Sequence, residues 1–233
     1  MAHAVTYPAG RSDVAAGRRI VALLAVSVAL NTAGLAFDQS VDPRGASEAL
    51  AIGQSRIERT RVRFHQPYRL PVNRAPIDYL DVVTPFRSVV LAAEARVRAG
   101  ERPLGQREAL ALLGDRRGRI ELVIEMTFHP LNTFVGVPAY VASLVPVGLP
   151  GAPVAAINVE RHPRYGVRVD GIPPGATPPS LPPDPQRQEP VLGGTVIASF
   201  DGSTLNPNGI YDVVVSEAGK ESARVRMDLR ALR

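Results

Sequence analysis

The sequence predicts a mainly β protein: an antiparallel β-sandwich of immunoglobulin-like type, preceded by a short helical hairpin and an N-terminal signal or anchor helix. Three observations predict this class. An apolar stretch follows two arginines near the start, apolar residues then recur at helical spacing, and side chains alternate with a period of two in the second half. We therefore divide the chain into a signal peptide or membrane anchor (1–36), an extended tether or arm (37–83), the helical hairpin (84–114) and the sandwich (115–233).

The first segment has the residue order of an export signal. Arg18 and Arg19 precede an almost unbroken apolar run, Ile20–Leu30, and small residues at 34–36 favour cleavage after Ala36. Positive charge holds the leading end in the cytoplasm while the apolar run enters the membrane. This pattern predicts an extracytoplasmic protein, periplasmic or secreted.

Two alternatives for this segment stay open. Residues 20–37, interrupted by Asn31 and Thr32, fall within the roughly 17 to 25 residues that span a bilayer, so an uncleaved segment can anchor the chain in the inner membrane. The pair Arg18 and Arg19 also loosely matches a twin-arginine signal. A buried amphipathic helix is disfavoured, because almost no polar side chain occurs along the run.

The tether at 37–83 is predicted from polar and charged patterning. Ser47 is a candidate N-cap for a short helix at 48–52. Residues 56–64 alternate charged and mixed side chains, which suits an exposed strand or extended arm better than a core strand.

The helical hairpin has clear start and stop signals. Thr84 followed by Pro85 favours a helix start, and Gly100 favours its end. A second helix is expected at 106–113, ending at Gly114. The buried stripe of the first helix should contain Phe86, Val90, Ala93 and Val97.

The clearest strand is 119–129, where every second residue from Ile120 to Phe128 is apolar. Seven strands joined by turns suggest a sandwich. The other six candidates are 139–147, 154–160, 166–169, 195–200, 210–216 and 223–232.

A proline-rich loop at 171–190 interrupts this strand pattern. It holds eight of the 22 prolines, too many for a helix or a central strand. It is therefore predicted to be an extended spacer, the alternative being a docking ligand for an aromatic groove.

Composition excludes several classes of function. The formal charge of +5 comes from scattered arginines without stacking aromatics beside them, so we expect no nucleic-acid partner. The absence of cysteine excludes disulfides, thiolate metal sites and a thiol nucleophile.

Two groups of residues are candidates for metal sites. Asp201 and the segment 206–209 gather oxygen-bearing side chains that could hold a cation such as calcium, but these residue types are equally those of a turn. Tyr211, just beyond, is interpreted as a strand aromatic of a kind common in immunoglobulin-like domains. His65, His129 and His162 are more than thirty residues apart, so we expect separate histidines and no metal triad.

We find no catalytic pattern. No Gly-x-Ser-x-Gly elbow occurs, Ser203 is interpreted as a turn serine, and no helix follows Gly193-Gly194 to bind phosphate. Glu121 and Glu125 would lie about 13 to 14 Å apart on one strand, beyond the roughly 5 to 10 Å of paired glycosidase carboxylates. No catalytic, cofactor-binding or metal-binding residue is therefore assigned.

The predicted function is a non-catalytic interaction or scaffolding module outside the cytoplasm, with an envelope protein or a glycan as partner and no cofactor. The alternative is an extracytoplasmic hydrolase or carbohydrate-active protein with a site in loops around His129 and Asp201.

Overall fold

The computed structural model describes residues 37, 39–129, 131–148, 151–166 and 191–233, all within one compact unit. The predicted signal or anchor segment (1–36) and the proline-rich loop (171–190) lie outside the described residues. Within the described ranges, no helix combines the length and the hydropathy needed to cross a bilayer.

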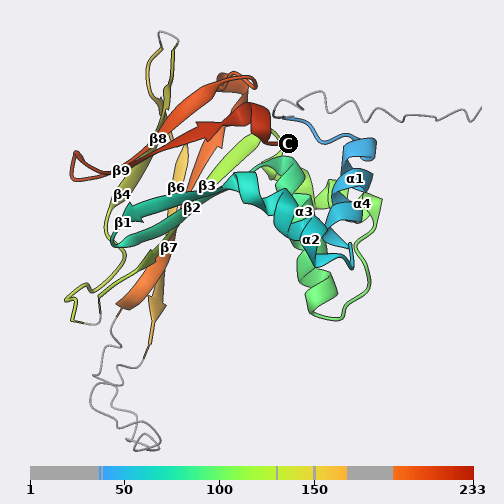
Figure 1. The fold of residues 1–233 in the computed structure, drawn as a ribbon, viewed down its shortest axis with the longest axis horizontal. Helices are drawn as coiled ribbons and strands as arrows, with labels where there is room; N and C mark the ends of the chain where they lie inside the picture. The colour runs from blue at the N-terminus through green and yellow to red at the C-terminus, as the bar shows by residue number, and fades with distance from the viewer. Residues whose placement is uncertain (1–36, 38, 130, 149–150, 167–190) are drawn as a thin grey trace, which may run out of the picture. The chain divides into compact units, whose positions relative to one another are not determined.

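Two antiparallel sheets face each other as a β-sandwich (Figure 1). The five-stranded sheet is built from β1 (Arg69–Arg74), β2 (Ile77–Val83), β3 (Arg119–Thr127), β6 (Asn158–Tyr165) and β7 (Val191–Asp201). The four-stranded sheet is built from β4 (Tyr140–Pro146), β5 (Val154–Ala155), β8 (Ile210–Glu217) and β9 (Lys220–Asp228). Their strand orders are β1-β2-β3-β7-β6 and β5-β4-β8-β9.

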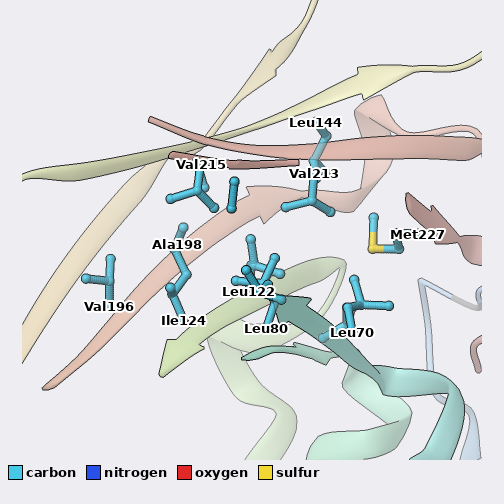
Figure 2. Packing of buried hydrophobic residues seen from close by; sticks show 14 of the residues in the cluster. Leu70, Leu80, Leu122, Ile124, Leu144, Val196, Ala198, Val213, Val215 and Met227 are labelled. Atoms are coloured by element: carbon cyan, nitrogen blue, oxygen red, sulfur yellow. The ribbon is translucent and has the colours of Figure 1, made fainter. Parts of the chain in front are cut away.

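Alternation along the strands places the main core between the sheets. Figure 2 shows Leu80, Leu122 and Ala198 of the five-stranded sheet pointing toward Val213 and Val215 of the four-stranded sheet. The predicted alternation in β3 is confirmed, since its even-numbered residues from 120 to 126 are buried and its odd-numbered ones are not. Burial of these side chains is the main stabilising contribution.

Four helices form a layer with a second core. They are α1 (Pro43–Gly53), α2 (Glu58–His65), α3 (Pro85–Arg98) and α4 (Gln106–Leu113). As predicted, the Thr84 side chain caps α3 by accepting from Arg87 N, 3.1 Å away, and Gly100 has a left-handed φ of 70° just beyond the helix. The core of this layer contains Val41, Ala46, Ala49, Leu50, Phe86, Val89, Val90, Ala93, Leu104, Ala109 and Leu113.

Phe64 joins the two cores. Its half-buried ring packs against both apolar clusters. Its centroid lies 5.1 Å from that of Tyr68 and 5.9 Å from that of Phe86. The helical layer therefore packs against the sandwich through aromatic side chains.

The prediction of an extended tether at 37–83 is wrong. Helix α1 begins at Pro43, where Asp42 and not Ser47 is the N-cap, and the charged segment around 58–65 is helix α2. Strands β1 and β2 then form one end of the five-stranded sheet. Helix α2 forms because Phe64 and His65 share the face that meets the rest of the protein, which the alternating charges obscured.

The position of the helical hairpin also differs from the prediction. Helices α3 and α4 do not precede the sandwich but interrupt it, since they lie between β2 and β3, which pair with each other.

Most strand predictions in the second half are confirmed with shifted ends. The predicted strand 154–160 divides into β5 and β6, and 223–232 is strand only to Asp228 before a 3₁₀ turn at Leu229–Ala231. The segment 167–169 lies outside the described residues.

Candidate functional site

The loop between β3 and β4 gathers exposed apolar side chains. Leu131, Phe134 and Val135 are 73%, 44% and 86% exposed. Single exposed apolar residues are ordinary, but several within one loop are typical of an interaction surface. We call Leu131, Phe134 and Val135 the apolar loop.

Hydrogen bonds from Asn132 fix the backbone of the apolar loop. Its side-chain amide donates to His129 O, 2.7 Å away, and to Val191 O, 3.1 Å away. Its side-chain oxygen accepts from Phe134 N at 2.8 Å. The loop is thereby tied to the first residue of β7, and an ordered loop loses less conformational entropy on binding than a mobile one.

Phe128 packs against the apolar loop from the side of the main core. Its ring is buried in the main core and lies 4.8 Å from the ring of Phe134, centroid to centroid. Its backbone N–H donates to Leu192 O at 3.0 Å. Phe134 is consequently held on one side by the core while its other side faces solvent.

Tyr165 adds an exposed aromatic ring at the same end of the sandwich. It is the last residue of β6 and pairs with Val191, the residue whose carbonyl accepts from Asn132. Tyrosine is enriched at protein interfaces, because it offers a large apolar area together with a polar hydroxyl.

The apolar loop lies far from the first described residue of the fold. Phe37 is 2% exposed and packs beside Gly202, whose carbonyl accepts from Gln39 Nε2 at 2.8 Å. Gly202 follows β7 at the end where β3 begins, whereas the loop follows the other end of β3. The length of β3 separates the two ends by roughly 27 Å.

A polar cluster joins the helices to the sheet. We call it the junction network: Arg69, Asp81, Arg87, His65 and Glu94. His65 Nε2 lies 2.9 Å from Glu94 Oε1, and Arg87 Nε donates to His65 Nδ1 at 3.3 Å. Asp81 lies 3.4 Å from the Arg87 guanidinium and 3.1 Å from that of Arg69.

The hydrogen-bond directions in this network argue for a structural role. A guanidinium only donates, so Nδ1 of His65 must accept, and Nε2 must carry the proton that Glu94 accepts. Both ring nitrogens are therefore engaged by side chains of the network.

Arg87 is the central residue of the junction network. Its side chain is buried, donates to Val82 O at 2.6 Å and stacks on the ring of Tyr68, 4.9 Å from its centroid. Burial lowers the pKa of Arg87, although the carboxylate of Asp81 opposes this shift. The guanidinium remains charged, because arginine does not lose its proton in proteins.

The three histidines occupy separate environments. Besides His65 in the junction network, His129 Nδ1 accepts from Leu131 N at 3.1 Å, and His162 lies 3.5 Å from Glu160 on β6. Among the residues that the structure describes, no three His, Cys, Asp or Glu side chains gather as a metal site.

The oxygen-bearing segment after β7 forms turns. Asp201 accepts from the backbone and hydroxyl of Ser203, which lowers the pKa of the Asp201 carboxyl. Asn206 Oδ1 accepts from Asn208 N at 3.0 Å, and the Tyr211 hydroxyl accepts from Asn206 N at 2.7 Å. These side chains therefore satisfy backbone donors within the turn.

Glu121 and Glu125 point outward from β3 and have different partners. Glu121 lies 3.8 Å from the Arg116 guanidinium, whereas Glu125 accepts from the Thr195 hydroxyl at 2.8 Å and lies 3.6 Å from that of Arg164. The structure does not bring the two carboxylates together as an acid–base pair.

His129 and Asp201 do not share a site either. Asp201 pairs with Arg119 at one end of β3, and His129 follows Thr127 at the other end. The same roughly 27 Å of strand therefore separates these two residues. This geometry disfavours a hydrolase centred on them.

Comparison with known proteins identifies no relative: no family model, curated protein or solved structure matches the chain.

The sequence contains a signal for the apolar loop that does not depend on alternating side chains. Leu131, Phe134 and Val135 stand among the turn-forming residues of 130–138, where polar side chains are the rule. Apolar side chains in a predicted turn region are a reason to expect a binding surface.

Proposed function

We propose that the sandwich is of immunoglobulin-like type. If β2, β3, β6 and β7 are lettered A, B, D and E, the larger sheet has the order A-B-E-D with β1 added at the edge. The smaller sheet then has the order C′-C-F-G in β5, β4, β8 and β9. These orders agree with those of immunoglobulin domains, apart from the added edge strand and the helices inserted between A and B.

Tyr211 supports the same assignment. It is the second residue of β8, the F strand in this lettering, and its hydroxyl accepts from the backbone of Asn206 in the preceding turn. A tyrosine near the start of strand F that bonds to the backbone a few residues upstream is a hallmark of these domains.

We propose that the protein is an extracytoplasmic interaction module that binds another envelope protein through the apolar loop. The single observation that carries this proposal is the group of exposed apolar side chains on a hydrogen-bonded, core-supported loop. In immunoglobulin lettering this is the B–C loop, which belongs to the recognition end of variable domains.

The chemistry of the loop favours a protein over a glycan. Leu131 and Val135 offer aliphatic surface, which an apolar pocket of a protein complements. The position of the loop, at the opposite end of β3 from Phe37, leaves it accessible if residues 20–37 hold the chain at the membrane.

Crosslinking in isolated envelopes tests this function. The chain has no cysteine, so Val135→Cys gives a single attachment point for a photoreactive label in the full chain. We expect one stoichiometric protein adduct, and we expect Phe134→Ala to reduce it severalfold. The matched control is Glu101→Cys, an exposed position in the helical layer.

The proposal would be contradicted by an identical set of adducts from both positions, or by none from Val135. A glycan adduct would select the glycan alternative. Recovery of the intact chain only from the cytosol would refute export.

A further inference from the structure

A second exposed surface surrounds α2, and its charge is one-sided. Four arginines and one glutamate occur within 56–63, which gives a formal charge of +4 − 1 = +3. Arg61 approaches Glu94 at 4.0 Å, but Arg56, Arg59 and Arg63 form no ion pair with any described residue. Elsewhere most arginines of the described part of the chain are paired with carboxylates.

Apolar side chains accompany these arginines. Ile57 and Val62 are 64% and 61% exposed, and α2 buries none of its eight residues. Arg59 is a neighbour of both Val62 and Arg63 on the outer face of the helix, because these two residues lie three and four positions after it. The inner face holds Phe64 and His65.

The surface continues onto the end of α3. A shallow pocket of about 170 Å³ is lined by residues of both regions, among them Arg61, Val97 and Arg98. Arg98 has no ion pair among the described residues. Val97 is 44% exposed, so its predicted place in the buried stripe of this helix is wrong. The Glu94 carboxylate in this pocket is engaged by His65 and Arg61. We call the whole surface the α2 patch: Arg56, Ile57, Arg59, Val62, Arg63, Val97 and Arg98.

Helices α1 and α2 are the first elements of the described fold. Phe37, the first described residue, packs beside Gly202, and both helices follow within the next thirty residues. The apolar segment predicted to be an anchor, 20–37, ends where the fold starts, so the sequence leaves no spacer between them. An anchor at 20–37 would therefore tether the fold directly to a bilayer.

We propose that the α2 patch rests on an anionic phospholipid surface and so orients the apolar loop away from the membrane. This inference rests on the proposed extracytoplasmic location and on the uncleaved anchor at 20–37, the alternative to cleavage after Ala36. Unpaired arginines attract anionic headgroups, and neighbouring aliphatic side chains can enter the interface beside them. An acidic protein partner would be attracted to the same charges, but the adjoining anchor favours the membrane.

The test uses full-length protein reconstituted into vesicles. Val62→Cys carries a dye whose emission shifts to the blue in an apolar environment. We expect a blue shift in vesicles of equal parts phosphatidylcholine and phosphatidylglycerol, and none in phosphatidylcholine alone. The same dye on Leu131→Cys should respond to neither, because the loop lies at the far end of β3.

Charge variants distinguish electrostatic attraction to anionic lipid from general insertion of apolar side chains into the bilayer. Arg59→Glu with Arg63→Glu should abolish the shift, whereas Arg74→Glu, an exposed arginine at the β1–β2 turn, should preserve it. High salt should reduce the blue shift of the dye emission at least severalfold. The exposure of both patch arginines keeps the variants folded, which circular dichroism checks.

An equal response to neutral and anionic vesicles, or no response at Val62, would overturn the proposal. So would a specific protein adduct from a photoreactive label at Val62 in native envelopes. Because the vesicle test requires neither export nor a partner, its failure is distinguishable from failure of the apolar loop to bind a protein.

Discussion

Replacement of Arg87 by alanine tests whether the junction network holds the helical layer on the sheet. The substitution removes a charged hydrogen bond to Val82 O, the donor to His65 Nδ1 and one of two cations beside Asp81. Removing one member of a buried, paired group typically costs about 3 to 5 kcal/mol. We expect the free energy of unfolding to fall by about 3 kcal/mol, since Asp81 retains Arg69 as a partner.

Arg69→Ala is the matched control, because it removes the other arginine from the same carboxylate. The Arg69 side chain is 56% exposed, so water replaces it readily and we expect a loss of under ~1 kcal/mol. Equilibrium unfolding in urea measures both losses, with an unchanged dependence on denaturant as the sign that the two states are comparable.

Equal losses for the two variants, or a larger one for Arg69→Ala, would refute the reasoning. If Arg87→Ala does not fold, Arg87→Lys gives a second measurement. Lysine keeps the charge but lacks the planar fork that reaches Val82 O and His65 together, so we expect about 1 to 2 kcal/mol.

Three further predictions concern single features of the fold. Tyr211→Phe leaves Asn206 N–H without its acceptor and should lower the free energy of unfolding in urea by about 1 to 2 kcal/mol. An unchanged unfolding midpoint would contradict the role given to this hydroxyl. Ala218 has a left-handed φ of 49°, which favours asparagine or glycine, so Ala218→Asn should raise the melting temperature by about 2 °C, and a decrease would argue against strain there. The hydrogen bond from Arg233 lowers the pKa of Glu48 below its ordinary 4.5. The Glu48 carboxylate therefore stabilises the fold above pH 4.5, and this stabilisation is lost as the pH falls through the lowered pKa. Because this pair is about one-third exposed, Glu48→Gln should cost under ~1 kcal/mol at pH 7 and progressively less in acid, which urea titrations at several pH values measure.

Several elements were predictable because their signals are local. The Thr84-Pro85 start and the apolar spacing of α3 depend on neighbours three and four residues apart, and the alternation in β3 depends on every second residue. Both were predicted with nearly correct ends.

Strands β1 and β2 were missed because their alternation is interrupted. Prolines at 71 and 76 argue against a strand, and register shifts follow Pro71 in β1 and Ile77 in β2. A shift in register moves the following side chains to the opposite face, so a strict period of two fails across it. Only pairing with β3 identifies these segments as part of the sheet.

Helix α2 was missed for a different reason. Its charged residues at 59, 61 and 63 imitate a strand with one solvated face. The choice of helix is made by Phe64 and His65, whose partners Tyr68, Phe86 and Glu94 include residues more than twenty positions away. Helices this short depend on such tertiary contacts.

By itself, the sequence determined the mainly β class, the helices at 85–98 and 106–113 and most strands of the second half, because periodicity and capping are properties of neighbouring residues. Only the tertiary structure decided that the helices interrupt the sheet, that Arg87 is buried among its partners and that the apolar loop stays exposed. The reason is physical: exposure and pairing depend on which distant segments pack together, and the local pattern of a segment does not contain that information.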